Sequence, residues 1–332
     1  MSADFLQLDC EAEIARIAQR MRDLVLATLR RRGAIIAMSG GVDSSVCAAL
    51  AVRAFGTQRV FGLLLPEHES AGASATLGQA VGEQLGFPFI TEAIGSALDG
   101  IGCYRRRDEA IRAVFPDYTS AWKSKIVIAG GAGAGMTYFK LVVQSPDGAV
   151  QEKRLPAREY LQIVAATNFK QRFRKAVEYY HADRLHYAVL GTPNRVEFDQ
   201  GFFVKGGDGL ADVKPIAHLY KTQVYQLARH LGLPDAVCNA RPTTDTYSMA
   251  QGQDEFYFGL PYEKMDVALW FHNHQRSATD LAVTLGIGDA AAARVYQDIE
   301  SKRRTTAYLH ARPQLIEPVA ELHEIVGQTA RV

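Results

Sequence analysis

Short apolar runs alternate with helical stretches along much of this chain. Polar residues do not alternate within the runs, so they read as buried strands, at 34–38, 60–65, 87–90 and 187–190. Apolar residues spaced three and four apart predict helices at about 11–32, 43–56, 74–85, 157–181 and 219–231. Strands and helices in this order predict a Rossmann-like α/β fold, with a parallel sheet covered by helices on both faces.

Residues 100–156 fit this alternation poorly. The segment YRRRDEAIRAVF predicts a basic helix, and AGGAGAG at 129–135 predicts a flexible loop. The segment from Tyr138 to Leu155 predicts a β-hairpin that turns at Pro146-Asp147-Gly148. We therefore expect an insertion at 100–156 within a single domain spanning 1–332, followed by a helical C-terminal segment at 263–325.

Composition narrows the classes of ligand. The 37 Lys and Arg residues nearly balance 36 Asp and Glu residues, so no overall field attracts nucleic acid or a membrane surface. The four cysteines are scattered without metal-site spacing and predict reduced thiols. The N-terminus is acidic and helical rather than signal-like, and no apolar run reaches membrane-spanning length. We expect a cytoplasmic protein without nucleic-acid or membrane partners.

The segment MSGGVDSSV at 38–46 joins the first predicted strand to a helix. Glycines allow close approach of the backbone, and the amide groups at a helix N-terminus attract anions, so the segment predicts a phosphate site. The sequence contains no Gly-Lys dipeptide, which excludes the common P-loop, and no GxGxxG turn lies between a strand and a helix.

Residues 39–44, SGGVDS, resemble the pyrophosphate loop (PP-loop) of the ATP pyrophosphatases, which have an adenine nucleotide alpha hydrolase-like fold. Four further segments occur in the order found in ammonia-dependent NAD synthetases: NFKQRFR at 168–174, the long segment at 191–224 that begins GTPNRVEF, RPTTD at 241–245 and LPYEKMD at 260–266. Together they cover most of the chain outside 100–156, and the chain resembles that family.

The resemblance assigns roles to individual residues. ATP, a co-substrate, would be bound by Ala37, Met38, Ser39, Gly40, Gly41, Val42, Asp43, Ser44, Thr192, Lys221 and Thr243. Asp43 and Glu197 would hold Mg²⁺, and Asp43 and Lys221 would be the catalytic residues. The second substrate, deamido-NAD, would be bound by Arg172, Lys205, Asp212 and Lys302.

The implied reaction converts deamido-NAD to NAD through an acyl-adenylate, with ammonia as the nitrogen donor and AMP and pyrophosphate as by-products. The resemblance also implies a homodimer. The chain begins almost directly at the synthetase core, so we expect no fused glutaminase, and a separate glutaminase that supplies ammonia stays open as a partner. The family's C-terminal His-Lys pair is here Ser301-Lys302, and only the lysine carries over.

Three alternatives remain at this point. A related PP-loop enzyme could amidate a different carboxylate, since the departures at 100–156 and Ser301 both fall on the acceptor side. A tRNA-modifying pyrophosphatase is disfavoured by the near-neutral charge and by the absence of paired cysteines. A catalytically silent nucleotide sensor would not need to retain Asp43, Glu197 and Lys221 together.

Overall fold

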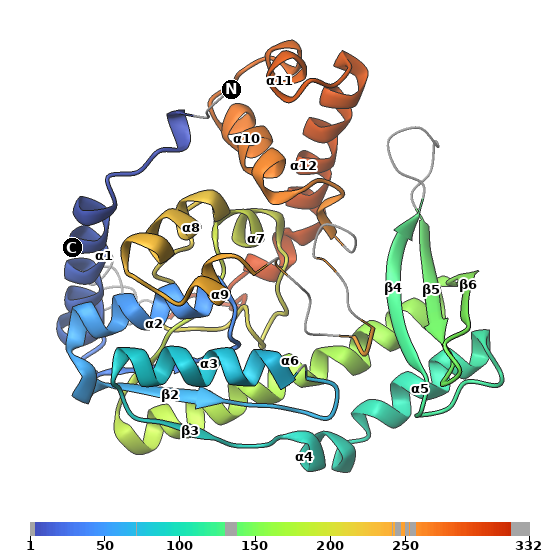
Figure 1. Ribbon diagram of the computed structural model, residues 1–332, viewed down its shortest axis with the longest axis horizontal. Coiled ribbons are helices and arrows are strands. Elements are labelled where there is room, and N and C mark those ends of the chain that lie inside the picture. The colour runs from blue at the N-terminus through green and yellow to red at the C-terminus, as the bar shows by residue number, and fades with distance from the viewer. Residues whose placement is uncertain are drawn as a thin grey trace.

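A parallel sheet lies between helices in the body of the computed structural model (Figure 1). The structure describes residues 4–70, 72–129, 138–240, 242, 247–249, 252 and 257–319. The sheet has four strands in the order β3-β2-β1-β7. They are β1 (Ala34–Ala37), β2 (Val60–Leu64), β3 (Phe89–Thr91) and β7 (Ala188–Val189). Neighbouring strands all pair in parallel, which confirms the predicted fold class.

Successive strand residues face two different cores, because side chains alternate across a sheet. Ile36 and Leu64 lie in one core, with α1 (Cys10–Arg22), α2 (Val42–Phe55), α3 (Gly72–Leu85) and α8 (Lys221–His230). Ile35 and Leu63 lie in the other, with residues of α4 (Gly95–Gly100), α5 (Cys103–Val114) and α6 (Ala157–Leu185). Helices on both faces explain why β1, β2 and β7 contain no polar side chain.

Some predicted boundaries differ from those observed. The helix expected over 11–32 ends as α1 at Arg22 and continues as a short π-helix, η2 (Asp23–Thr28). The strand expected over 87–90 begins only at Phe89, after Pro88, which has no N–H to donate to a ladder. A short turn of 3-10 helix, η3 (Thr57–Arg59), precedes β2.

The predicted hairpin belongs to a second, antiparallel sheet (Figure 1). Its strands are β4 (Lys123–Ala129), β5 (Tyr138–Gln144) and β6 (Val150–Arg154). The hairpin turns where predicted, with Gly148 at a φ of +92°. Residues 130–135 of the predicted loop lie outside the described residues, and residue 129 ends β4. Leu141 and Val143 of this sheet pack against Ile111 of α5 and Ile163 of α6.

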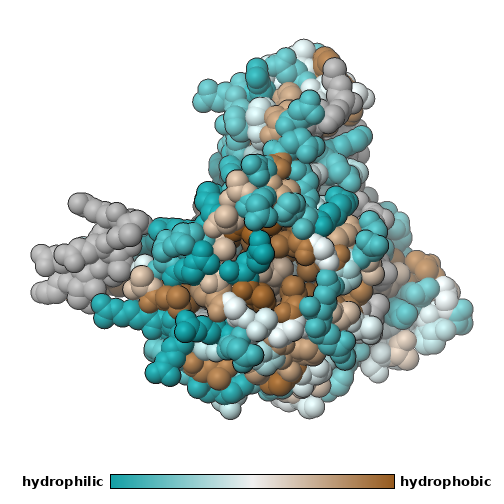
Figure 2. Space-filling view, turned by 60° about the vertical axis from the view of Figure 1, so that its left-hand side comes forward, coloured by the Kyte–Doolittle hydropathy of each residue, from teal (hydrophilic) through white to brown (hydrophobic). Residues whose placement is uncertain are grey.

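The C-terminal helices form a lobe that projects from the body of the molecule (Figure 1). They are α10 (Tyr262–Asn273), α11 (Ala278–Leu285) and α12 (Asp289–His310). Figure 2 shows hydrophobic residues gathered between this lobe and the body, whereas the lobe itself is mostly hydrophilic. Helix was predicted over 263–325, but α12 ends at His310. The prediction is wrong for 311–319, which are not helical and contain Pro313 and Pro318. Residues 320–325 lie outside the described residues.

Shorter elements connect these units: η1 (Asp4–Leu6), α7 (Arg195–Gln200) and α9 (Asp235–Cys238). Leu6 of η1, Val196 of α7 and Tyr220 share the core of the lobe. All four cysteines are free thiols, as predicted. In the part of the chain that the structure describes, no helix has both the length and the apolar character needed to span a bilayer.

Candidate active site

The loop between β1 and α2 is held by its own serines. Ser44 Oγ donates to Gly41 O at 3.0 Å and accepts from Ser39 N at 3.3 Å. Gly40 has a φ of +75°, and a Cβ there would collide with the carbonyl oxygen of Ser74. The loop therefore has a fixed shape at the N-terminus of a helix, where backbone amides and the helix dipole favour anions.

Asp43, in the first turn of α2, forms an ion pair with Lys221, the first residue of α8. The Lys221 side chain is 2% exposed and that of Asp43 17%. Burial alone would lower the pKa of Lys221, but the charges of Asp43 and Glu197 outweigh it and raise that pKa. The ammonium group therefore stays charged beside the loop at neutral pH.

A third element brings Glu197 to the same point. Asn194 caps α7: its Oδ1 accepts from Glu197 N, and its own N–H donates to Glu197 Oε2, both at 3.2 Å. The Asn194 amide also donates to Asp43 Oδ1 at 3.2 Å. Glu197 is buried, and burial together with the charge of Asp43 raises its pKa to about 8. Two carboxylates from distant parts of the sequence thus meet beside one buried ammonium.

Asp266 fixes the start of α8. Its two carboxylate oxygens accept from Lys221 N at 3.2 Å and from Thr222 N at 2.7 Å. Asp266 is fully buried, and burial raises its pKa to about 7 although the two backbone N–H groups act in the opposite direction. The carboxylate provides acceptors for helix N–H groups that lack partners within the helix.

A pocket of about 170 Å³ opens beside the loop, at the carboxyl ends of β1, β2 and β7. One wall is apolar, with Met38, Leu64 and Leu190 among its residues. The polar part of the lining includes Ser39, Ser70, Thr192, Arg174 and the buried ion pair between Lys175 and Glu178. Ligands of open α/β sheets bind at this edge of the strands.

The carboxylates fit a divalent cation. Asp43 and Glu197 supply hard oxygen donors of the kind that Mg²⁺ prefers. Burial first, and then the charge of Asp43, raise the pKa of Glu197, and a bound cation would oppose both by favouring the ionised carboxylate. Within the described ranges no three His, Cys, Asp or Glu side chains cluster as a metal site, so phosphate oxygens and water would have to complete the shell.

The structure brings together most residues predicted for ATP. Residues 37–44 form the loop, Thr192 lines the pocket with Ala37 and Met38, and Lys221 contacts Asp43. Thr243 lies outside the described residues.

Of the four residues predicted for deamido-NAD, Arg172 and Lys205 contact each other. Arg172 Nε donates to Lys205 O at 3.2 Å, and Lys205 Nζ donates to Tyr308 O at 2.8 Å. Asp212 accepts from Val189 N at 2.7 Å, and Lys302 donates to Tyr257 O at 2.8 Å. Each of these side chains is engaged by the main chain.

Sequence reasoning missed several residues of the site. Asn194 could have been found, because Asn-x-x-Glu before a helix is the signature of a capping box. Arg174 belongs to the segment NFKQRFR, yet Arg174, not Arg172, lines the pocket. Asp266 gave no local signal, because its partners lie on another helix.

Sequence comparison finds close relatives. The chain matches the NAD synthase family over residues 13–110 and 132–307. It is 54% identical to the NH(3)-dependent NAD(+) synthetase of Mesorhizobium japonicum, over 95% of this chain and 99% of the relative. It is also 54% identical to the NH(3)-dependent NAD(+) synthetase of Rhizobium meliloti, over 97% of this chain and 96% of that protein.

Solved structures show the same fold at lower identity. The NMN synthetase from Francisella tularensis superposes with a TM-score of 0.61 at 20% identity, covering 94% of this chain and 100% of that one. An NH3-dependent NAD synthetase from Campylobacter jejuni gives a TM-score of 0.61 at 18% identity, covering 93% and 100%. Together with the sequence match over most of its length, this means that the chain belongs to the NAD synthase family.

Proposed function

We propose that this protein is an ammonia-dependent NAD synthetase, a ligase that amidates deamido-NAD at the expense of ATP. The observation that carries the proposal is the meeting of Asp43, Lys221 and Glu197 beside the loop at 39–44. Relatives that are 54% identical over nearly the whole chain carry the same name. Amidation of a different carboxylate is not favoured, because these relatives span the acceptor side as well as the ATP side.

The first step activates the nicotinate carboxylate. One of its oxygens attacks the α phosphorus of ATP, the bond to the β phosphate oxygen breaks, and pyrophosphate leaves with the electron pair. The loop amides, with Ser39 and Ser44, bind the departing phosphates, and Lys221 neutralises part of their charge. The protein contributes positioning and charge stabilisation rather than a nucleophile.

The second step forms the amide. The lone pair of ammonia attacks the acyl carbon of the adenylate, the bond from that carbon to the phosphate oxygen breaks, and AMP leaves. The nitrogen then gives up one proton to yield the neutral amide. Adenylation matters because it converts a poor leaving group, the oxygen of a carboxylate, into a good one.

We propose Mg²⁺ as the cation held by Asp43 and Glu197. When bound, it would neutralise charge on the β and γ phosphates. Ser39, Ser44, Thr192 and Thr243 are proposed ATP contacts, and Arg172, Lys205, Asp212 and Lys302 proposed contacts of deamido-NAD. A homodimer, a cytoplasmic location and an external ammonia supply, from solution or from a separate glutaminase, complete the proposal. We also propose that the chain forms a single domain with an insertion at 100–156.

The purified protein tests this directly. Incubation with ATP, Mg²⁺, ammonium and deamido-NAD should yield NAD, AMP and pyrophosphate in equal amounts. Glutamine in place of ammonium should give no NAD unless a glutaminase is added. A parallel panel should contain nicotinate and nicotinate mononucleotide. AMP release with one of these acids, but none with deamido-NAD, would favour the alternative of another carboxylate acceptor.

A further inference from the structure

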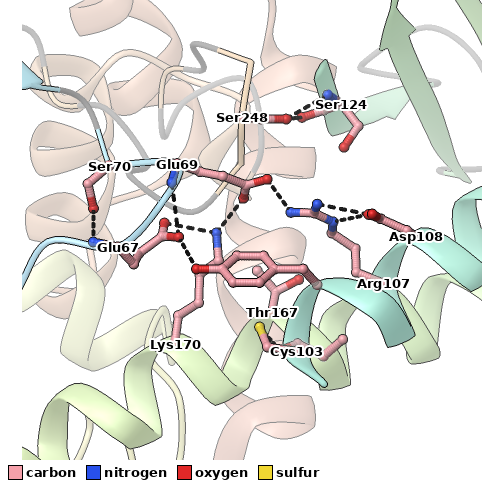
Figure 3. A network of polar contacts seen from close by, with 12 residues as sticks. Glu67, Glu69, Ser70, Cys103, Arg107, Asp108, Ser124, Thr167, Lys170 and Ser248 are labelled. Carbon is pink, nitrogen blue, oxygen red and sulfur yellow. Dashed lines mark hydrogen bonds and ion pairs between the residues drawn. The ribbon is translucent and has the colours of Figure 1, made fainter. Parts of the chain in front are cut away.

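The turn at 67–70, between β2 and α3, is closed by its own hydrogen bonds. Ser70 N donates to Glu67 O at 3.1 Å, and Glu67 N donates to Ser70 Oγ at 3.0 Å. Glu69 N donates to Glu67 Oε2 at 3.0 Å. Figure 3 shows both glutamate side chains directed toward Lys170. The turn therefore places two carboxylates close together in the interior.

Lys170 of α6 holds both carboxylates. Its Nζ lies 3.0 Å from Glu67 Oε1 and 2.6 Å from Glu69 Oε2 (Figure 3). Tyr104 of α5 donates to Glu67 Oε2 at 2.6 Å. The side chains of Lys170 and Glu67 are 1% and 0% exposed. Burial alone would raise the pKa of Glu67, but Lys170 and the hydrogen bonds lower it, so the carboxylate is ionised at neutral pH.

Arg107 of α5 provides a second cation. Its Nη1 lies 2.5 Å from Glu69 Oε1, and its Nη2 lies 2.8 Å from Asp108 Oδ1. Only 8% of the Arg107 side chain is exposed. Buried ion pairs of this kind often add no more stability than apolar side chains of similar size. What they do provide here is a fixed position for the turn relative to α5 and α6.

The turn borders the pocket of the candidate active site. Ser70 and Arg174 both line it. Arg174 Nε donates to Leu65 O at 3.2 Å, and its Nη2 lies 3.5 Å from Ser70 Oγ. Arg174 follows Lys170 by one helical turn of α6, so the helix that holds the turn also presents Arg174 to the pocket. A shift of the turn would move Ser70 and change its contact with Arg174.

Helix α5, which carries Arg107, joins the turn to the inserted sheet. Arg107 faces the turn, whereas Ala110 and Ile111 pack into a core with Ile126 of β4 and Leu141 of β5. Ser124, also on β4, donates its N–H to the Ser248 hydroxyl at 2.8 Å (Figure 3). The inserted sheet is therefore linked, through α5, to the turn that borders the pocket.

We propose that Arg107 and Lys170 are positioning residues for ATP: by holding Glu67 and Glu69, they place Ser70 and Arg174 against the nucleoside half of the nucleotide. The assignment rests on the proposed use of ATP, whose phosphates would lie at the opposite end of the pocket, at the loop. It gives the inserted sheet a role, because α5 transmits the position of that sheet to the nucleotide site.

Replacement of Arg107 by methionine tests the proposal. Arg107→Met should raise the KM for ATP about tenfold, with kcat and the KM for deamido-NAD changed less than about twofold. Arg107→Lys should recover part of the loss, because it retains the charge but not the planar fork. Arg105→Met is the matched control: this arginine lies on the same helix, is exposed and forms an ion pair with Glu109, so the KM for ATP should stay constant.

Ser70→Ala provides the direct readout at the pocket. It should raise the ATP KM severalfold, and in the Arg107→Met background it should add little, because both changes act through the same turn. The proposal would be overturned if the rise in the KM for ATP in the double variant equalled the product of the rises in the two single variants. An unchanged ATP KM in Arg107→Met would also overturn it, even if the melting temperature of that variant falls. If Arg107→Met fails to fold, Arg107→Lys takes its place in the cycle. A smaller rise in the KM for ATP is then expected, and no rise would overturn the proposal.

The affinity for a non-hydrolysable ATP analogue, measured by calorimetry without acceptor, separates this inference from the proposed function. Arg107→Met should weaken analogue binding about tenfold even if deamido-NAD is not the acceptor. Equal affinity in wild type and variant would overturn the positioning role, whether or not the wild-type protein makes NAD.

Discussion

The two ends of the candidate site are built differently. On the ATP side, charged side chains meet one another: Lys221 pairs with Asp43, and Glu197 lies beside both. On the acceptor side, Arg172 and Lys205 donate to main-chain carbonyl oxygens instead. A carboxylate neutralises the cation that it pairs with, whereas a neutral carbonyl oxygen leaves the charge of the cation unchanged. The charges proposed for ATP are thus paired with one another. Of the cations proposed for the acceptor, Arg172 and Lys205 bond to carbonyl oxygens, and Lys302 pairs with Asp298.

The difference also concerns burial. Lys221 is 2% exposed, and Asp266, which holds its helix, is fully buried. Arg172 is exposed, and Lys205 is only partly buried. Charges in a buried site act strongly on a bound ligand. Removal of one charged side chain there leaves its ion-pair partner buried without a counter-charge. Substitutions on the ATP side should therefore have larger effects than equivalent ones on the acceptor side.

The largest effect is expected for Asp43→Asn. Loss of this carboxylate should lower Mg²⁺-dependent AMP formation by about a hundredfold or more, the scale of removing one strong electrostatic group. Steady-state kinetics on protein with a native circular dichroism spectrum would measure it. Asp235→Asn is the matched control, since Asp235 also lies in the first turn of a helix but is exposed. Near-normal AMP formation by folded Asp43→Asn would remove Asp43 from the site.

The second effect is on stability against pH. The pKa of Asp266 is raised to about 7 by burial, whereas in an unfolded chain it is near 3.9, so the folded state binds the proton more tightly. Its contribution to stability should therefore fall by about 2 kcal/mol as pH rises from 5 to 7. Denaturant unfolding of Asp266→Asn should lack this decline. Glu263→Gln, an exposed position on the same helix, should retain it.

A smaller effect is expected from Arg172→Lys on the acceptor side. Lysine cannot reproduce a planar guanidinium, so the KM for deamido-NAD should rise about tenfold while that for ATP stays constant. Arg158→Lys, an exposed arginine near the start of the same helix, serves as the control. An equal rise in both KM values would contradict the separation of the two sides.

The smallest effect is expected from Ser301→His, which restores the residue that the family resemblance implies. The KM for deamido-NAD should fall by about two- to threefold, because one added hydrogen-bond donor at a partly exposed position contributes little. A loss of activity would indicate that α12 is packed differently around Ser301 than the resemblance suggests.

Much of the fold could be predicted from local patterns. The strands at 34–38 and 60–65 and the helices that follow them were predicted within a few residues, because apolar periodicity reflects burial directly. Prolines explain two of the differences, at Pro88 and beyond residue 310. The predicted residues of the ATP side that the structure describes also lie together, since parallel strands bring their carboxyl ends to one edge.

The sequence by itself determined the chemistry of the loop at 39–44, because glycine, serine and aspartate at a strand-to-helix turn act through contacts only a few residues apart. The tertiary structure alone decided which charges meet. Lys221 and Asp43 are 178 residues apart, and Lys170 and Glu67 are 103 apart. No local periodicity encodes such pairs, because their geometry depends on how α6 and α8 pack against the sheet. The same packing directs Arg174, rather than Arg172, into the pocket.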